Sequence, residues 1–346
     1  MQDRSDDPRA QPRRRSSAPI AGLLALVVAV AGAVGITTAA DRQVGGVDRI
    51  ADLDDVLVAV DGPAVNYLLI GSDSREGIEE GGGDFAATGG ADDVGGRRSD
   101  TIIVLRQEED GNGAALLSLN RDLWVEQSDT GAMDRINAAY NRGANVLAAT
   151  ITQNYGIPIN HVVDVDFRGF KQIVDTIGGT TVCFMHPSRD VKSGLDQPAG
   201  CNLLGGEQAL AYARSRTFQE LVDGDWRTDG SADLGRVRRQ QGFISDTVNQ
   251  TLQKLSSDPF LASRLIDATS GSMRLDPNLD PLSAAGTLRK AFGAGLTTYT
   301  LPSEVATIDG KSVLTLVDGE RAQAILDYFR GTGPLPPPEQ PTDGGG

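Results

Sequence analysis

The sequence predicts an α/β fold in which a mixed central sheet is flanked by helices, after one N-terminal membrane helix. Short apolar runs bounded by glycine or polar turns are typical of buried strands, and three of them fall within about fifty residues. Strand-like runs then alternate with helical periodicity, which favours an α/β sandwich over a barrel or a bundle. An uncharged apolar stretch from Ala18 to Ile36 precedes them all.

The first forty residues predict the cellular compartment. The apolar stretch is just long enough for one membrane helix. Residues 1–17 carry more arginine than aspartate, so the positive-inside rule keeps this tail in the cytoplasm. We expect residues 18–40 to be a signal-anchor that crosses the cell membrane once and leaves the rest of the chain extracytoplasmic. A cleaved signal peptide is the alternative, because Thr38, Ala39 and Ala40 suit a cleavage site.

The exported part is predicted to form one catalytic domain, at residues 63–330. Residues 41–62 mix short apolar and acidic segments and are interpreted as a stalk or a peripheral element. Residues 331–346 are rich in proline and glycine and are expected to be disordered. The predicted strands are all short apolar runs between turns, at residues 66–71, 101–106, 114–119, 161–167, 180–184 and 297–301.

The predicted helices begin and end at ordinary helix signals. Residues 136–155 have helical spacing that is interrupted at Gly143, and Asp233 is a suitable N-cap for a helix at residues 235–255. Residues 76–96 are rich in glycine and aspartate and are predicted to be a loop. Further helices are expected at residues 170–177, at 206–213 and, two or three in number, within 258–329.

Charge and composition argue against several functions. The chain has 32 Lys and Arg against 47 Asp and Glu, a net charge of −15, which is unfavourable for binding nucleic acid. Two cysteines and two histidines are too few for a zinc site with four such ligands. A bound metal would therefore be a hard cation held by carboxylate oxygens.

Export also bears on the two cysteines. Cys183 and Cys201 would lie in a non-reducing compartment, where thiols tend to pair. A disulfide that closes a loop of about 18 residues stabilises the fold by roughly 3 kcal/mol. Two unrelated buried thiols are the alternative.

Polar clusters occur where the predicted strands and helices end. Each cluster alone is typical of a solvated surface pair. However, the chain has 27 arginines and only 5 lysines, and the planar guanidinium fork matches phosphate oxygens. Several such forks beside Asp73 and Asp100 would suit a pyrophosphate with a divalent cation. The clusters all place arginine near a carboxylate or a second arginine, at residues 71–75, 97–101, 120–122, 214–216 and 233–241.

Seven segments in series resemble the LytR-CpsA-Psr (LCP) family of bacterial cell-envelope proteins. No single segment is specific, but their order along the chain is that of the family. The resemblance covers roughly residues 65–255. The segments are LLIGSDSR at 68–75, RSDT at 98–101, NRD at 120–122, RINAAY at 135–140, VDFRGF at 165–170, GGEQALAYARSR at 205–216 and GRVRRQQ at 235–241.

The resemblance implies an LCP-like α/β sandwich and a phosphotransferase that depends on Mg²⁺ (or Mn²⁺). Such an enzyme moves a glycopolymer from a polyprenyl-pyrophosphate carrier in the membrane onto peptidoglycan. The carrier lipid would lie in an apolar pocket between sheet and helices. A sugar hydroxyl would attack the phosphorus next to the glycan, and the carrier phosphate would leave. A polyprenyl-pyrophosphate hydrolase and a non-catalytic envelope regulator are the alternatives.

The resemblance also implies roles for individual residues. Asp73 and Asp100 would hold the metal. The residues that would contact the pyrophosphate are Arg75, Arg98, Arg121, Arg214, Arg216, Arg236, Arg239 and Gln240. The catalytic residues would be Asp100, Arg121, Arg236 and Asp233. Of these, Asp233 would orient the arginines.

Three points stay open in the sequence. The general base is Asp100 or Asp122. Asn120 stands where the family often has proline. The long loop at residues 76–96 leaves the distance between Asp73 and Asp100 undetermined.

Overall fold

The computed structural model describes residues 47–60, 62, 64–72, 99–108, 113–215, 217–228, 243, 247, 254, 261–280, 284, 291 and 294–338. The predicted tail and membrane helix lie outside these ranges, as does the predicted loop at residues 76–96. Within the described ranges, no helix is both long and apolar enough to cross a membrane. Of the predicted helix at residues 235–255, only Phe243, Thr247 and Lys254 are described, and they are helical.

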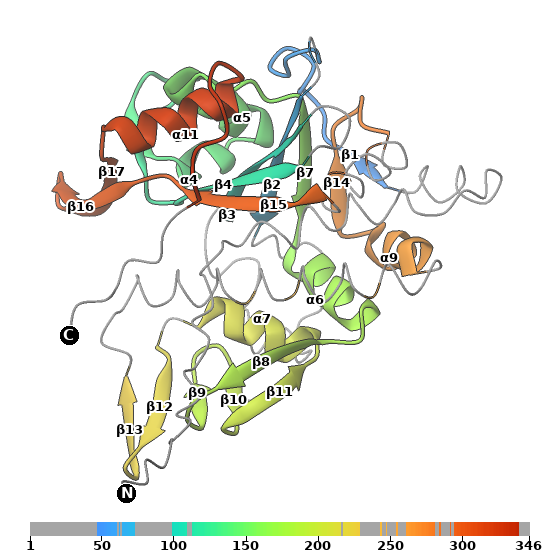
Figure 1. Cartoon of the computed structure of the whole chain (residues 1–346), viewed down its shortest axis with the longest axis vertical. Coiled ribbons are helices and arrows are strands. Elements are labelled where there is room, and N and C mark those ends of the chain that lie inside the picture. Colours follow the sequence, from blue (N-terminus) through green and yellow to red (C-terminus); the bar gives the residue numbers. More distant parts are fainter. Residues whose placement is uncertain are drawn as a thin grey trace, which may run out of the picture.

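A mixed seven-stranded sheet forms the centre of the protein, in the order β1-β14-β7-β2-β3-β4-β15 (Figure 1). Three neighbouring pairs are parallel, β1 with β14, β7 with β2, and β4 with β15, and the other three are antiparallel. The predicted mixed central sheet is therefore confirmed. The strands are β1 (Asp48–Arg49), β2 (Val65–Ser72), β3 (Ser99–Gln107), β4 (Ala114–Leu119), β7 (His161–Val165), β14 (Met273–Leu275) and β15 (Leu296–Thr300).

Helices α4 (Asn137–Tyr140), α5 (Ala144–Tyr155) and α11 (Glu320–Arg330) cover one face of the sheet (Figure 1). Leu68 and Ile70 of β2 point into this layer and are fully buried. The sequence predicted one interrupted helix at residues 136–155, whereas the chain forms two. The break lies at Gly143, whose φ of 147° disfavours other residues, and a Cβ there would lie 2.2 Å from Asn145 Oδ1.

Helices α6 (Phe167–Thr176), α7 (Gly206–Arg214) and α9 (Leu261–Thr269) lie on the other side of the sheet (Figure 1). Leu69 of β2, Ile173 of α6 and Leu265 of α9 are buried in this second apolar layer. Helix α6 begins three residues before the predicted start. The reason is an N-cap at Asp166, whose carboxylate accepts a hydrogen bond of 2.8 Å from the Gly169 N–H.

Two small sheets follow α6 along the chain. Strand β8 (Thr180–Phe184) pairs with β11 (Gly200–Leu204), and Cys183 lies directly opposite Cys201. The two cysteines form a disulfide, as the sequence predicted. The second sheet has the order β10-β9-β12-β13 and consists of β9 (Ser188–Asp190), β10 (Leu195–Gln197), β12 (Gln219–Val222) and β13 (Asp225–Thr228).

Two further hairpins were not predicted. Strands β5 (Trp124–Glu126) and β6 (Met133–Arg135) form one, and β16 (Ser303–Ile308) and β17 (Lys311–Leu316) form the other. The second hairpin turns at Asp309-Gly310, where both residues have positive φ. An Asp-Gly pair between two alternating runs is a hairpin signal.

The ends of the domain also differ from the sequence interpretation. Part of the predicted stalk belongs to the fold, because β1 joins the central sheet and Leu53 is fully buried. This favours the peripheral element over a free stalk for residues 47–60. Residues 331–338, expected to be disordered, run back over α11, where the Pro336 carbonyl accepts a 2.5 Å hydrogen bond from Tyr299 Oη. Residues 339–346 lie outside the described part.

Candidate active site at the carboxyl end of the sheet

The predicted polar clusters gather at one end of the central sheet. Strands β2, β4 and β7 run in the same direction, and β3 runs against them. The carboxyl ends of β2, β4 and β7 therefore lie beside the amino end of β3, and we call this the carboxyl end of the sheet. Ligands of α/β sheets usually bind at this end.

A β-bulge places the backbone of Asp100 at this end. Gly71 pairs with Thr101 and Ser72 pairs with Ser99, so the strand register skips Asp100. Bulges often occur beside active sites, because they redirect a side chain. A Cβ on Gly71 would lie 2.9 Å from the Thr101 Cβ, so this close approach requires glycine. Ser72, at the end of β2, therefore lies beside the backbone of Asp100, although the long predicted loop separates the two residues in the sequence.

Arg121 follows β4 in a turn that Asn120 stabilises. The Asn120 side-chain oxygen accepts a 3.0 Å hydrogen bond from the Asp122 N–H, which accounts for asparagine where the family often has proline. The Asp122 carboxylate lies between two guanidinium groups. Its oxygens are each 3.5 Å from an Nε, that of Arg121 and that of Arg135. One carboxylate therefore orients two arginines at the carboxyl end of the sheet.

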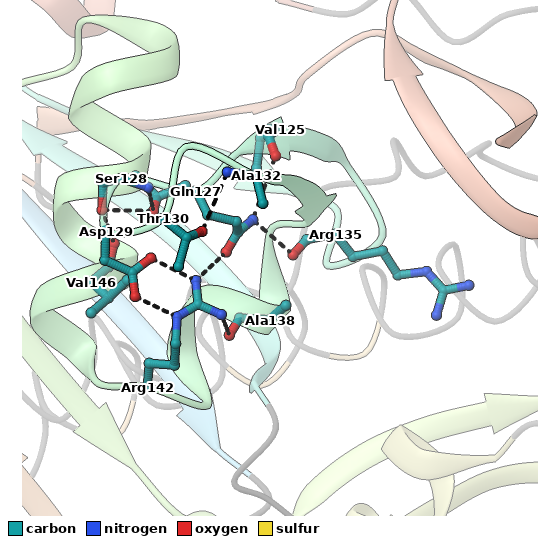
Figure 2. A network of polar contacts seen from close by, with 11 residues as sticks. Val125, Gln127, Ser128, Asp129, Thr130, Ala132, Arg135, Ala138, Arg142 and Val146 are labelled. Carbon is teal, nitrogen blue, oxygen red and sulfur yellow. Dashed lines mark hydrogen bonds and ion pairs between the residues drawn. The ribbon is translucent and has the colours of Figure 1, made fainter. Parts of the chain in front are cut away.

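A polar network holds the hairpin that carries Arg135 (Figure 2). Arg142 binds Asp129 through two hydrogen bonds of 2.6 and 2.9 Å and donates a third, of 2.7 Å, to Gln127 Oε1. This guanidinium lowers the pKa of Asp129. Buried Gln127 in turn donates to the carbonyl oxygen of Arg135 at 3.3 Å. The Arg135 side chain points away from the network, toward Asp122 and the Ser312 carbonyl.

Arg214 reaches the same end of the sheet from α7. Its guanidinium carbon lies 4.8 Å from the centre of the Phe167 ring, and Phe167 begins α6 two residues after β7 ends. A guanidinium stacked on an aromatic face keeps hydrogen-bond donors at its edge for other partners. The structure thus joins two motifs that are far apart in sequence.

A buried charged cluster beneath this end was missed by the sequence analysis. Asp164 on β7 accepts hydrogen bonds from Tyr140 Oη, at 2.7 Å, and from Arg274 on the neighbouring β14. Burial, followed by the charge of Asp164, raises the pKa of Tyr140 far above its usual value, so this phenol stays a neutral donor. The available signal was an aspartate inside the apolar strand at residues 161–165.

Asp166 is a second acidic group at this end whose environment is unusual. Its pKa is raised to about 6, chiefly by burial and to a smaller extent by the negative charge of Asp164. The backbone N–H groups of Gly169 and Arg168 act in the opposite direction, because they favour the charged form. The carboxylate caps α6, so its first role is structural.

The structure describes only part of the predicted site. It places Arg121, Arg214 and the backbone of Asp100 at the carboxyl end of the sheet. The remaining predicted site residues lie outside the described part of the chain: Asp73, Arg75, Arg98, Arg216, Asp233, Arg236, Arg239 and Gln240.

The fold is an α/β/α sandwich with arginines and a bulged acidic residue at the carboxyl end of its sheet, the end at which α/β proteins usually bind their ligands. The family model described as LytR_cpsA_psr matches residues 37–328, and the chain belongs to this family.

Named relatives share this family. The chain is 29% identical over 266 residues to cell wall biosynthesis protein LcpA of Corynebacterium glutamicum, a match that covers 67% of this chain and 48% of LcpA. It is 33% identical over 180 residues to the polyisoprenyl-teichoic acid–peptidoglycan teichoic acid transferase TagU of Enterococcus faecalis, covering 51% and 55%. The chain thus spans about half the length of these curated relatives.

A solved structure has the same fold. The LytR-Csp2A-Psr enzyme from Actinomyces oris superimposes with a TM-score of 0.59 and 24% identity, covering 82% of this chain and 94% of the other. The α/β arrangement predicted from the sequence is therefore that of a known LCP structure.

The groups at this end of the sheet suit a hard cation. The oxygen Oδ1 of buried Asp164 has no hydrogen-bond partner among the described residues. Mg²⁺ and Mn²⁺ bind such oxygen ligands. No group of three or more His, Cys, Asp or Glu gathers among the described residues, which do not include Asp73. The expected metal therefore stays a prediction.

Proposed function

We propose that the protein is a Mg²⁺-dependent phosphotransferase that moves a glycopolymer from a polyprenyl-pyrophosphate carrier onto peptidoglycan. The observation that carries this proposal is the gathering of Arg121, Arg214 and Asp100 at one end of the sheet. The family and the names of LcpA and TagU support the same activity. Arg121 and Arg214 would supply two guanidinium groups to the diphosphate.

In the proposed reaction, a sugar hydroxyl of peptidoglycan attacks the phosphorus next to the glycan. A new P–O bond forms to the acceptor oxygen, and the bridging P–O bond breaks. The carrier leaves as polyprenyl phosphate, and the hydroxyl proton passes to a base. Catalysis consists mainly of positioning and charge neutralisation, to which the guanidinium groups of Arg121 and Arg214 contribute.

Asp100 and Asp122 are the two candidates for the base, and the contacts of Asp122 bear on the choice. Both oxygens of Asp122 face guanidinium groups, so we assign Asp122 to orienting Arg121 and Arg135. Asp100 then remains as the candidate base. Asp73 and Asp100 would also hold Mg²⁺, which when bound neutralises phosphate charge.

The location of the carrier follows from the proposed anchor. A signal-anchor at residues 18–40 would leave the catalytic domain outside the cell membrane, next to the bilayer that holds the polyprenyl chain. The apolar layer between the sheet and helices α6 and α7 is the proposed site of the isoprenoid tail.

The test incubates the full-length protein, purified in detergent, with a polyprenyl-pyrophosphate-linked glycan, Mg²⁺ and a peptidoglycan fragment. Glycan joined to peptidoglycan supports the transferase. Free glycan phosphate indicates a hydrolase, and no turnover indicates a binding or regulatory protein. Chelation with EDTA should stop the reaction and Mg²⁺ should restore it, whereas Asp100→Ala should remove the response to the metal.

Arg121→Ala should reduce kcat by about a hundredfold or more, because the variant loses a charge-stabilising donor at the phosphates. Arg216→Ala and Arg236→Ala are expected to have the same effect while leaving the fold intact. Arg227→Ala is the matched control, since Arg227 lies on the exposed β12–β13 hairpin and pairs only locally with Asp223. Unchanged transfer by Arg121→Ala would exclude this residue from the phosphate site.

A further inference from the structure

Asp190 is a buried carboxylate outside the predicted site, at the end of β9. Its side chain has no exposed surface. From the described residues its two oxygens accept five hydrogen bonds, all donated by uncharged groups. The donors are Ser215 Oγ, Thr217 N and Thr217 Oγ1, each at 2.7 Å, and the backbone N–H groups of Lys192 and Ser193, at 2.9 and 3.4 Å.

The carboxylate is ionised in spite of its burial. Burial alone raises the pKa of Asp190, but the hydrogen bonds from Ser215, Thr217 and the Lys192 N–H together lower it below its usual value. Hydrogen bonds to a charged acceptor are about twice as strong as neutral ones. Asp190 therefore holds its donors firmly.

The three shortest of these hydrogen bonds come from the segment that directly follows Arg214. Ser215 is the C-cap of α7 and directly follows Arg214, whose guanidinium lies over Phe167. Thr217 comes two residues later, so Asp190 holds the chain on both sides of position 216. Three of the five hydrogen bonds thus fix the end of α7.

Asp190 itself is held by its surroundings. Strand β9 pairs with β10 and β12, and Gln208 on α7 accepts a 2.9 Å hydrogen bond from Gln197 of β10. The disulfide between Cys183 and Cys201 closes the loop that contains Asp190. This support makes the carboxylate a fixed point against which the end of α7 is set.

We propose that Asp190 is a positioning residue that sets the place of Arg214 for binding a polyprenyl diphosphate. The inference rests on the proposed function, since it assigns Arg214 to the diphosphate. A carboxylate is required because all five partners donate. An asparagine would turn an NH₂ group toward some of these donors.

The test compares two probes with the same lipid tail, geranylgeranyl diphosphate and geranylgeranyl monophosphate, by calorimetric titration of the full-length protein in detergent. Asp190→Asn should weaken diphosphate binding by about tenfold or more. Monophosphate binding should change by less than about threefold, because one phosphate still finds the remaining donors. A selective loss of diphosphate binding indicates positioning, because a general loss of structure would weaken the binding of both ligands alike.

Conservative variants keep the test informative if Asp190→Asn folds poorly. Thr217→Val removes one donor and should lower the preference for diphosphate, whereas Thr217→Ser keeps the hydroxyl and should restore it. Asp196→Asn, an exposed change on the same β9–β10 hairpin, is the matched control and should bind as wild type.

Two outcomes overturn the inference. One is that Asp190→Asn and Thr217→Val retain the wild-type preference for diphosphate, and the other is that they lose both probes equally. Either result excludes the positioning role of Asp190 and leaves the proposed function standing. A wild-type protein that shows no preference for diphosphate would instead overturn the proposed function, and the inference with it.

Discussion

Arg274→Met is expected to destabilise the protein by about 3 kcal/mol, because it leaves the buried Asp164 carboxylate without its cation. The side chain of Asp164 is 1% exposed and that of Arg274 is 29% exposed. Breaking a fully buried ion pair costs about 3–5 kcal/mol, and the partial exposure of Arg274 places this pair at the lower limit. Methionine retains most of the apolar part of the arginine side chain, so the loss of stability reports on the removed positive charge.

A double-mutant cycle isolates the pair from the other contacts of Arg274. The four proteins are wild type, Arg274→Met, Asp164→Asn and the double variant, each unfolded in urea as the full chain and followed by circular dichroism. We expect a coupling free energy of about 2 kcal/mol, since the double variant no longer buries an unpaired charge. A coupling free energy below about 0.5 kcal/mol would refute the reasoning. Arg227→Met should leave the free energy of unfolding within about 0.5 kcal/mol of wild type, because its pair with Asp223 is exposed.

Two further predictions concern stability. Asp166→Asn keeps the α6 N-cap but removes a carboxyl whose folded-state pKa is raised to about 6. Because the folded state disfavours the charged form, the wild-type protein loses stability as the pH rises from about 4 to about 7. Urea unfolding should show Asp166→Asn more stable than wild type by about 2 kcal/mol at pH 7.5, after discounting for partial exposure, and by no more than about 0.5 kcal/mol at pH 4; a gain that does not depend on pH would contradict this. Cys183→Ser combined with Cys201→Ser should lower the free energy of unfolding by roughly 3 kcal/mol under oxidising conditions. Under a strong reductant the double variant and wild type should unfold alike, and a difference that persists there would assign the effect to packing.

Local patterns were sufficient for much of the framework. A strand buried on both faces is a nearly continuous apolar run, which is why β4, with Ser118 as its one polar residue, could be predicted to the residue from its sequence. Polar residues that directly follow strands of one direction emerge at the same end of the sheet, so the position of Arg121 at the carboxyl end of β4 could be predicted from the sequence. The disulfide needed only two cysteines and an oxidising compartment.

Hairpins were harder to predict, although some carried a local signal. The turn at Asp309-Gly310 has the residues that positive φ requires, yet the flanking strands bury few side chains and lack a strong apolar pattern. The same holds for the hairpin that turns at Asp223-Gly224. Weakly buried strands take their pairing from the surface beneath them, which the sequence pattern does not record.

Long-range pairing was decided by the folded arrangement alone. Arg274 is 110 residues from Asp164 and meets it because β14 pairs with β7. The bulge at Asp100 depends on the register between β2 and β3, and the place of Arg214 depends on how α7 packs beside Phe167. Asp190 and Ser215 meet for the same reason. Apolar periodicity and turn residues act over a few neighbours, so they specify elements and their ends, whereas the contacts between charged groups arise only when packing brings those elements together.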